Sequence, residues 1–93
     1  MTYNLDFLES ASKEWRKLDG GIREQFKKKL KERLENPRVQ KDQLHGARDR
    51  YKIKLRRAGY RLVYQVMDSE IVVLVIAVGK REGSAVYDTA ARR

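Results

Sequence analysis

Basic side chains alternate with apolar ones in the segment RYKIKLRR, residues 50–57. Successive side chains of a β-strand point to opposite faces, so Lys52, Lys54 and Arg56 would share one face of a sheet. Asp49 is the only acidic residue close to them in the sequence. Because like charges on neighbouring strand positions repel one another, the pattern predicts a basic face that a polyanion completes.

A tight turn at Ala58-Gly59 would bring a further cation to the same face. A four-residue loop at 57–60 gives the same register, whereas a three-residue loop would mix basic and apolar residues on both faces, which burial disfavours. The predicted cross-strand pairs are Arg57–Tyr60, Arg56–Arg61, Lys54–Val63 and Lys52–Gln65. Lys52, Lys54, Arg56 and Arg61 then lie on one face. The other face, expected beneath the helices, holds Tyr51, Ile53, Leu55, Leu62, Tyr64 and Val66.

Cations gathered in this way suit the chemistry of phosphate esters. Arginine matches pairs of phosphate oxygens, clustered lysines lower one another's pKa so that one could remove a proton, and fixed cations stabilise developing charge. Attack of an RNA 2′-hydroxyl on its own phosphodiester needs all three. Arg81 and Tyr87 would join the cluster if the C-terminal helix folds across this face. From the residues alone, plain binding of a polyanion is the commoner role, and catalysis stays open beside it.

Composition limits the other classes of function. Lys and Arg outnumber Asp and Glu by 22 to 13 in 93 residues, and the net charge of +9 indicates an anionic partner. The length predicts a single domain, 1–93. There is no cysteine, and His45 is the only histidine, so neither thiolate chemistry nor a metal site is expected. The longest apolar run, 71–78, is too short to span a membrane, and a cytoplasmic protein without membrane contact is expected.

Hydrophobic periodicity predicts the elements that must position the basic face. A short strand is expected at 2–7, and helical spacing follows over 8–18 and 22–34. Gly20-Gly21 is expected to stop the first helix, and Asn36-Pro37 to end the second, so the two helices form a hairpin.

The second half of the sequence predicts a sheet. After a loop at 38–49, strands are expected at 50–57, 60–67 and 71–79, and a short helix follows with Ser84 as a possible N-cap. The third of these strands is apolar on both sides, so it is either central or covered by the C-terminal helix. The expected fold class is α+β: an N-terminal strand and a helical hairpin packed on one face of a small antiparallel β-sheet, with a short C-terminal helix.

Several longer strings resemble the RelE family of toxin–antitoxin modules, within the RelE/ParE superfamily. The strings are KEWRKL (13–18), REQ and KKKL (within 23–30), YKIKLR (51–56), GYRLVYQV (59–66), VGKRE (78–82) and VY (86–87). The resemblance covers nearly the whole chain. It implies a metal-independent endoribonuclease, without a cofactor, that cleaves messenger RNA in the ribosomal A site by attack of the 2′-hydroxyl.

The resemblance also implies roles for single residues. Lys52, Lys54 and Arg61 would hold the scissile phosphate, Lys54 or Tyr87 would act as base, and Arg81 would support the leaving oxygen. Further contacts to RNA are expected from Lys27, Lys28, Lys31, His45, Arg48, Arg50, Arg56 and Lys80. Expected partners are the 70S ribosome with its 16S rRNA, messenger RNA and a RelB-type antitoxin, and promoter DNA only through the antitoxin complex.

Two positions depart from the family pattern. His45 stands where an Arg is expected, and Gly83 replaces a common basic residue, which would weaken backbone contacts. Two other functions are weighed: a non-catalytic toxin resembling ParE, which acts by binding gyrase, and a basic RNA-binding module without chemistry. The joint presence of Lys52, Lys54, Arg61, Arg81 and Tyr87 argues against the gyrase binder, which has no need of them.

Overall fold

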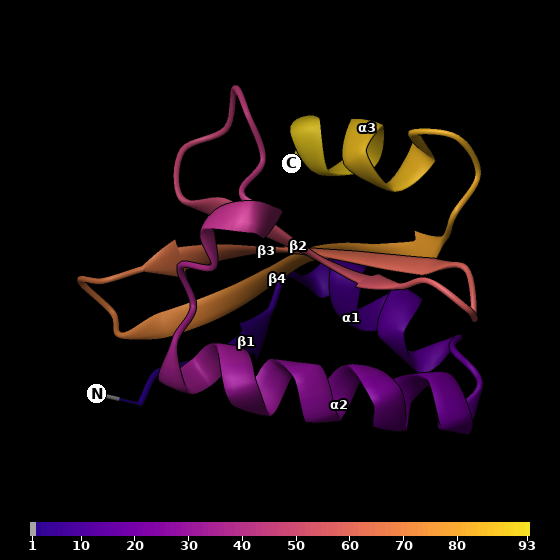
Figure 1. The fold of residues 1–93 in the computed structure, drawn as a ribbon, viewed down its shortest axis with the longest axis horizontal. Helices are drawn as coiled ribbons and strands as arrows, with labels where there is room; N and C mark the ends of the chain where they lie inside the picture. Colours follow the sequence, from indigo (N-terminus) through magenta and orange to yellow (C-terminus); the bar gives the residue numbers. More distant parts are fainter. Residues whose placement is uncertain (1) are drawn as a thin grey trace.

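The computed structural model describes residues 2–93, which fold into a sheet with helices on both sides (Figure 1). The strands are β1 (Asn4–Phe7), β2 (Arg50–Leu55), β3 (Tyr60–Met67) and β4 (Val72–Lys80). The helices are α1 (Glu9–Arg16), α2 (Gly20–Glu35), α3 (Ala85–Ala91) and a short 3₁₀ turn, η1 (Gln40–Asp42). This is the predicted order of elements. None of the described helices is long and apolar enough to cross a bilayer.

The sheet is mixed, which corrects the expectation of an antiparallel one. Its strand order is β1-β4-β3-β2, and β1 runs parallel to β4, with Asn4 opposite Val72. The other two pairings are antiparallel. The sequence did not indicate the direction of β1 relative to its neighbour, because β1 pairs with β4, far along the chain. Alternation of side chains shows which residues share a face, but it does not show whether two strands are parallel.

The strands of the β2–β3 hairpin have the predicted faces but not the predicted register, and Arg56, predicted on the basic face, lies in the loop instead. Leu55 lies opposite Tyr60 and Lys54 lies opposite Arg61, so the loop consists of residues 56–59. Gly59, with φ of +73°, closes this loop by donating its N–H to the Leu55 carbonyl at 2.8 Å. The pairing is thus displaced by two residues. A displacement of two keeps every side chain on its own face, because the side-chain period of a strand is two.

Two apolar cores lie on the two sides of the sheet. The larger one is formed with α1 and α2 and includes Phe26, Leu30, Tyr51 and Tyr64. The smaller one lies under α3, where Val86 and Ala90 pack against Val63, Ile76 and Ala77. Figure 1 shows α3 on the side of the sheet opposite α1 and α2, with the 38–49 loop beside it. β4 is therefore apolar on both sides because it is both central and covered by α3.

The helix boundaries contain one clear correction. Gly20 and Gly21 do not end α1; they are the first residues of α2, and α1 already ends at Arg16. The Asp19 carboxylate accepts the N–H of Gly21 at 3.0 Å, so it caps α2. Asn36-Pro37 ends α2 as predicted. Ser84 stands at the N-cap of α3, but its hydroxyl donates to Asp88 at 2.8 Å instead of accepting a backbone N–H.

Candidate active site

The basic face consists of the side chains of Lys52, Lys54 and Arg61, on the side of the sheet that α3 covers. Lys54 and Arg61 are directly opposite each other on β2 and β3, and Lys52 lies opposite Val63. The alternate residues Ile53 and Leu55 are buried in the larger core, which fixes the orientation of β2. The three cations are therefore held by rigid strands.

Arg61 is a buried cation without an anionic partner. Only 8% of its surface is exposed, and its guanidinium donates to the Tyr60 carbonyl at 2.9 Å. Within residues 2–93, neither Arg61 nor the two basic-face lysines form an ion pair. A buried charge normally requires an opposite charge, so the basic face has the character of an anion-binding site.

The neighbours of Lys54 change its proton affinity. Lys52 holds the pKa of Lys54 below its usual value, with smaller contributions from desolvation, Arg56 and Arg61; Asp42 acts weakly in the opposite direction. The positive potential disfavours the ammonium form. Lys54 therefore gives up its proton more readily than an ordinary lysine.

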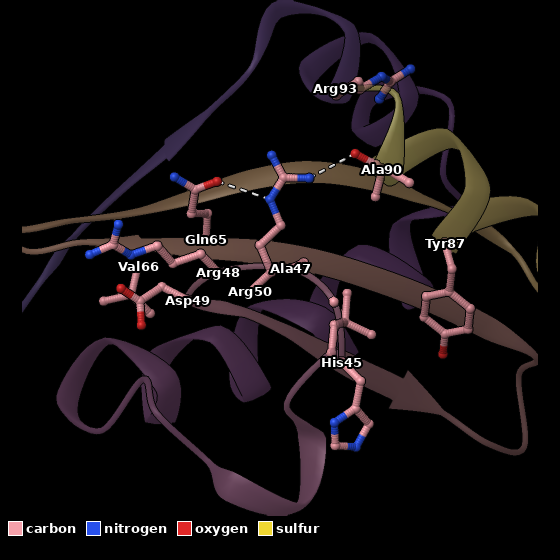
Figure 2. Close-up of a pocket in the computed structure, with 13 residues that line it drawn as sticks. His45, Ala47, Arg48, Asp49, Arg50, Gln65, Val66, Tyr87, Ala90 and Arg93 are labelled. Carbon is pink, nitrogen blue, oxygen red and sulfur yellow. Dashed lines mark hydrogen bonds between the residues drawn. The ribbon is translucent and has the colours of Figure 1, made fainter.

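Arg81 and Tyr87 do not belong to the β2–β3 hairpin: Arg81 follows β4, and Tyr87 is on α3. The Arg81 N–H donates to the Gly59 carbonyl at 2.7 Å, which fixes the residue after β4 against the hairpin loop. Its side chain is exposed. Tyr87 lies on α3, is half-buried and packs against the smaller core. Figure 2 shows its ring extending from α3 beside the sheet, on the side where His45 lies.

A cavity of about 710 Å³ opens between α3 and the loop that precedes β2 (Figure 2). Tyr87, His45 and Arg48 line it, together with Arg50. His45 and Arg48 are exposed on the loop, whereas Arg50 is half-buried. Tyr87 thus borders a hollow that is large enough for a nucleobase and its sugar and that the loop cations also line.

The residues predicted to contact RNA fall into separate regions. Arg56 lies in the β2–β3 loop, and Lys80, at the end of β4, lies opposite Tyr60. Both are exposed near the basic face. Lys27, Lys28 and Lys31 are exposed on α2, which covers the other side of the sheet. The structure therefore does not bring the α2 lysines to the basic face; they form a second cationic surface.

A family model described as the ParE toxin of type II toxin–antitoxin systems, parDE, matches residues 5–84. The chain belongs to the RelE/ParE superfamily. It is 61% identical over 93 residues to the mRNA interferase toxin RelE of Escherichia coli K12, with 100% of this chain and 98% of the relative covered. The identity and coverage are the same for the mRNA interferase RelE of Shigella flexneri.

Solved structures of E. coli RelE have the same fold as this superfamily member. A RelE mutant with two arginines changed to alanine, in the free state, matches with a TM-score of 0.92 and 60% identity, covering 100% of this chain and 98% of that one. RelE in the intact RelBE toxin–antitoxin complex matches with a TM-score of 0.83 and 62% identity, covering 86% and 98%. The similar structures therefore include both a free toxin and an antitoxin-bound toxin.

Sequence reasoning missed two arginines that shape this superfamily member's site. Arg33 was given no role, but it pairs with Asp42 at 2.6 Å and donates to the Lys52 carbonyl at 3.2 Å. Arg93 pairs with Glu14 at 2.9 Å. A usable signal existed for Arg33 because it adjoins the apolar stripe of Leu30 and Leu34. No signal existed for Arg93, because its partner lies at the other end of the chain.

Proposed function

We propose that the protein is a ribosome-dependent mRNA endonuclease, the toxin of a type II toxin–antitoxin system. The proposal rests on one observation above the others: Arg61 is buried opposite Lys54, and no carboxylate of residues 2–93 forms an ion pair with it. Identity of 61% with RelE proteins that are named mRNA interferases supplies the class of substrate. An RNA phosphate is the anion that the basic face accommodates.

The reaction is an attack of an RNA 2′-hydroxyl on the adjacent phosphorus. Lys52, Lys54 and Arg61 hold the phosphate and stabilise the charge that accumulates on its oxygens. The lowered pKa of Lys54 favours this residue as the base; Tyr87 is the other candidate for that role and also stacks on a base. Arg81 supports the departing 5′-oxygen. The P–O5′ bond breaks as the P–O2′ bond forms, which leaves a 2′,3′-cyclic phosphate and a 5′-hydroxyl.

The ribosome contributes the geometry that the protein lacks. A base weakened by its cationic surroundings reacts efficiently only when the 2′-hydroxyl, phosphorus and 5′-oxygen are already in line. The decoding site would present the message in that form. The α2 lysines Lys27, Lys28 and Lys31, with His45, Arg48, Arg56 and Lys80, would contact rRNA or message phosphates and orient the protein.

A RelB-type antitoxin is the regulatory partner. RelE relatives have been solved with RelB and with a RelB peptide. An antitoxin that covers the basic face would exclude RNA from it, and promoter DNA would be bound only through the complex. The expected compartment is the bacterial cytoplasm, where ribosomes and messages meet.

A programmed ribosome tests this function directly. The purified protein is added to 70S ribosomes with a defined codon in the A site, and the ends of the message are mapped. We expect one cut within the A-site codon and a 2′,3′-cyclic phosphate on the upstream product. Absence of a cut would overturn the proposal and favour a toxin that acts by binding alone. Cleavage of free RNA at an equal rate would overturn the dependence on the ribosome.

A further inference from the structure

Helix α3 is too short to hold its own position above the basic face. It contains seven residues, and isolated helices of this length are not stable in water. Val86 and Ala90 are its buried residues. Its first turn has no side-chain cap, because the Ser84 hydroxyl is directed to Asp88. The position of α3 therefore depends on the packing of these two residues and on contacts at its C-terminal end.

Arg50 supplies one of these contacts. Its Nη1 donates to the Ala90 carbonyl at 2.7 Å, and its Nε donates to the Gln65 side-chain oxygen at 2.9 Å (Figure 2). Gln65 is the cross-strand partner of Arg50, so the guanidinium is oriented from within the sheet. Carbonyls in the last turn of a helix lack intrahelical partners, and a cation there is favourable. Arg50 thus joins the start of β2 to the end of α3.

Arg93 holds the same end of α3 from the other side. Its Nη1 donates to the Ile76 carbonyl and to the Glu14 carboxylate, both at 2.9 Å. The same Glu14 oxygen accepts the Val78 N–H at 3.2 Å. Ile76 and Val78 lie on the part of β4 that extends beyond its pairing with β1, and Glu14 lies on α1. Arg93 therefore fixes α3 to β4, while Arg50 fixes it to β2 and β3.

Tyr87 is close to the Arg50 contact along the helix. It precedes Ala90 by three residues, and residues three apart lie on the same side of a helix. Both residues line the cavity between α3 and the loop that precedes β2. A shift of the Ala90 carbonyl would therefore move the Tyr87 ring relative to Lys54 and Arg61.

We propose that Arg50 is a positioning residue, which holds α3 through the Ala90 carbonyl and thereby sets the place of Tyr87 over the basic face. The inference rests on the proposed function for the role of Tyr87, but the attachment of α3 does not. It differs from the expectation that Arg50 contacts RNA. In the structure its guanidinium is directed to protein groups, and it acts on the reaction through α3.

The attachment is tested without any reaction. Amide hydrogen exchange of α3 is measured in the free protein for Arg50→Ala, with Arg48→Ala as the matched control, because Arg48 carries the same charge two residues before Arg50 and is exposed. Arg50→Ala should exchange the α3 amides about tenfold faster, as expected for loss of one charge-assisted hydrogen bond, and should shift the NMR signals of the Tyr87 ring. Arg48→Ala should do neither. Unchanged exchange and ring signals in Arg50→Ala would overturn the proposal.

A double-mutant cycle then separates positioning from RNA contact. Single-turnover cleavage on saturating programmed ribosomes is compared in wild type, Arg50→Ala, Tyr87→Ala and the double variant. Arg50→Ala should slow cleavage about tenfold, with ribosome affinity unchanged, and should add nothing in the Tyr87→Ala background. Two losses that multiply, or a loss of affinity, would assign Arg50 to RNA and overturn the proposal. If wild type itself does not cleave, the proposed function fails, and the exchange experiment still decides the attachment of α3.

Discussion

Three ion-paired arginines and the cations on the basic face are the same kinds of side chain in opposite situations. The paired arginines are Arg33 with Asp42, Arg38 with Asp49 and Asp68, and Arg93 with Glu14. Lys52, Lys54 and Arg61 have no carboxylate partner within residues 2–93. Each paired arginine joins separate elements of the fold, and Arg50 does so through a carbonyl and an amide oxygen. Cations that are directed to protein groups are therefore structural, whereas those of the basic face are left for a ligand.

The Arg33 contacts show how far a paired cation can become structural. The side chains of Arg33 and Asp42 are only 12% and 15% exposed. Arg33 also donates to the Tyr64 hydroxyl at 2.8 Å, and that hydroxyl donates to the Pro37 carbonyl at 2.6 Å. This network holds α2 and η1 against β2, the outer strand of the sheet, and its contact with the Lys52 carbonyl supports the backbone beneath the basic face.

Removing a basic-face cation should have the largest effect on activity. Lys54→Met keeps the aliphatic chain but loses the amine, so both phosphate stabilisation and proton transfer suffer. We expect single-turnover cleavage on programmed ribosomes to fall by about two to four orders of magnitude, while ribosome affinity changes little. Lys13→Met is the matched control, because Lys13 is exposed on α1 and paired with Glu9. A parallel fall in affinity would make the basic face a docking surface only.

Removing one of the three paired arginines should affect stability instead of activity. Arg33→Ala leaves Asp42 without its partner and frees the Tyr64 hydroxyl. We expect the free energy of unfolding to fall by about 3 kcal/mol, the range for half of a buried ion pair. Urea denaturation followed by the fluorescence of Trp15 measures it. If Arg33→Ala cost no more than Arg56→Ala, the distinction between paired and unpaired cations would not hold.

Neutralising Lys52 should change the titration of its neighbour. Lys52 is the largest cause of the lowered pKa of Lys54, so Lys52→Gln should raise that pKa toward its ordinary value. A base acts in its neutral form, and a higher pKa means that higher pH is needed to reach it. The rising limb of any pH–rate profile governed by Lys54 should therefore move to higher pH.

An NMR titration of the Lys54 side chain in the free protein measures this pKa without ribosomes. Lys80→Gln is the control, because Lys80 is exposed at the end of β4 and is not among the causes of the shift. A Lys54 pKa that stays in place in Lys52→Gln would mean that desolvation, and not the neighbouring charge, lowers it.

The smallest expected effect is a gain in stability, in contrast to the loss expected for Arg33→Ala. Arg56 is exposed, unpaired and contributes to the positive potential at Lys54. Removing it should relieve repulsion, so Arg56→Gln should raise the free energy of unfolding by a few tenths of a kcal/mol. The gain should shrink in high salt, which screens exposed charges. A loss of stability would indicate an unrecognised partner for Arg56.

Local patterns predicted the elements well because each depends on neighbours in the sequence. The alternation over 50–57 was enough to separate Tyr51, Ile53 and Leu55 from the cations, although the strand ends at Leu55. The hairpin register was wrong by two residues, because loop length depends on the backbone conformation of Gly59 and not on hydrophobicity. The role of Gly20-Gly21 was misjudged because glycine is tolerated both after one helix and at the capped start of the next.

The sequence by itself determined which cations share a face, because the period of two survives any shift of register by an even number of residues. It also determined the excess of positive charge and, through resemblance, the superfamily. Only the tertiary structure decided which cations are neutralised. Glu14 and Arg93 are 79 residues apart, and Arg38 and Asp68 are 30 apart. Coulomb attraction acts through space, so an ion pair exists only once the sheet and helices have brought its two charges together.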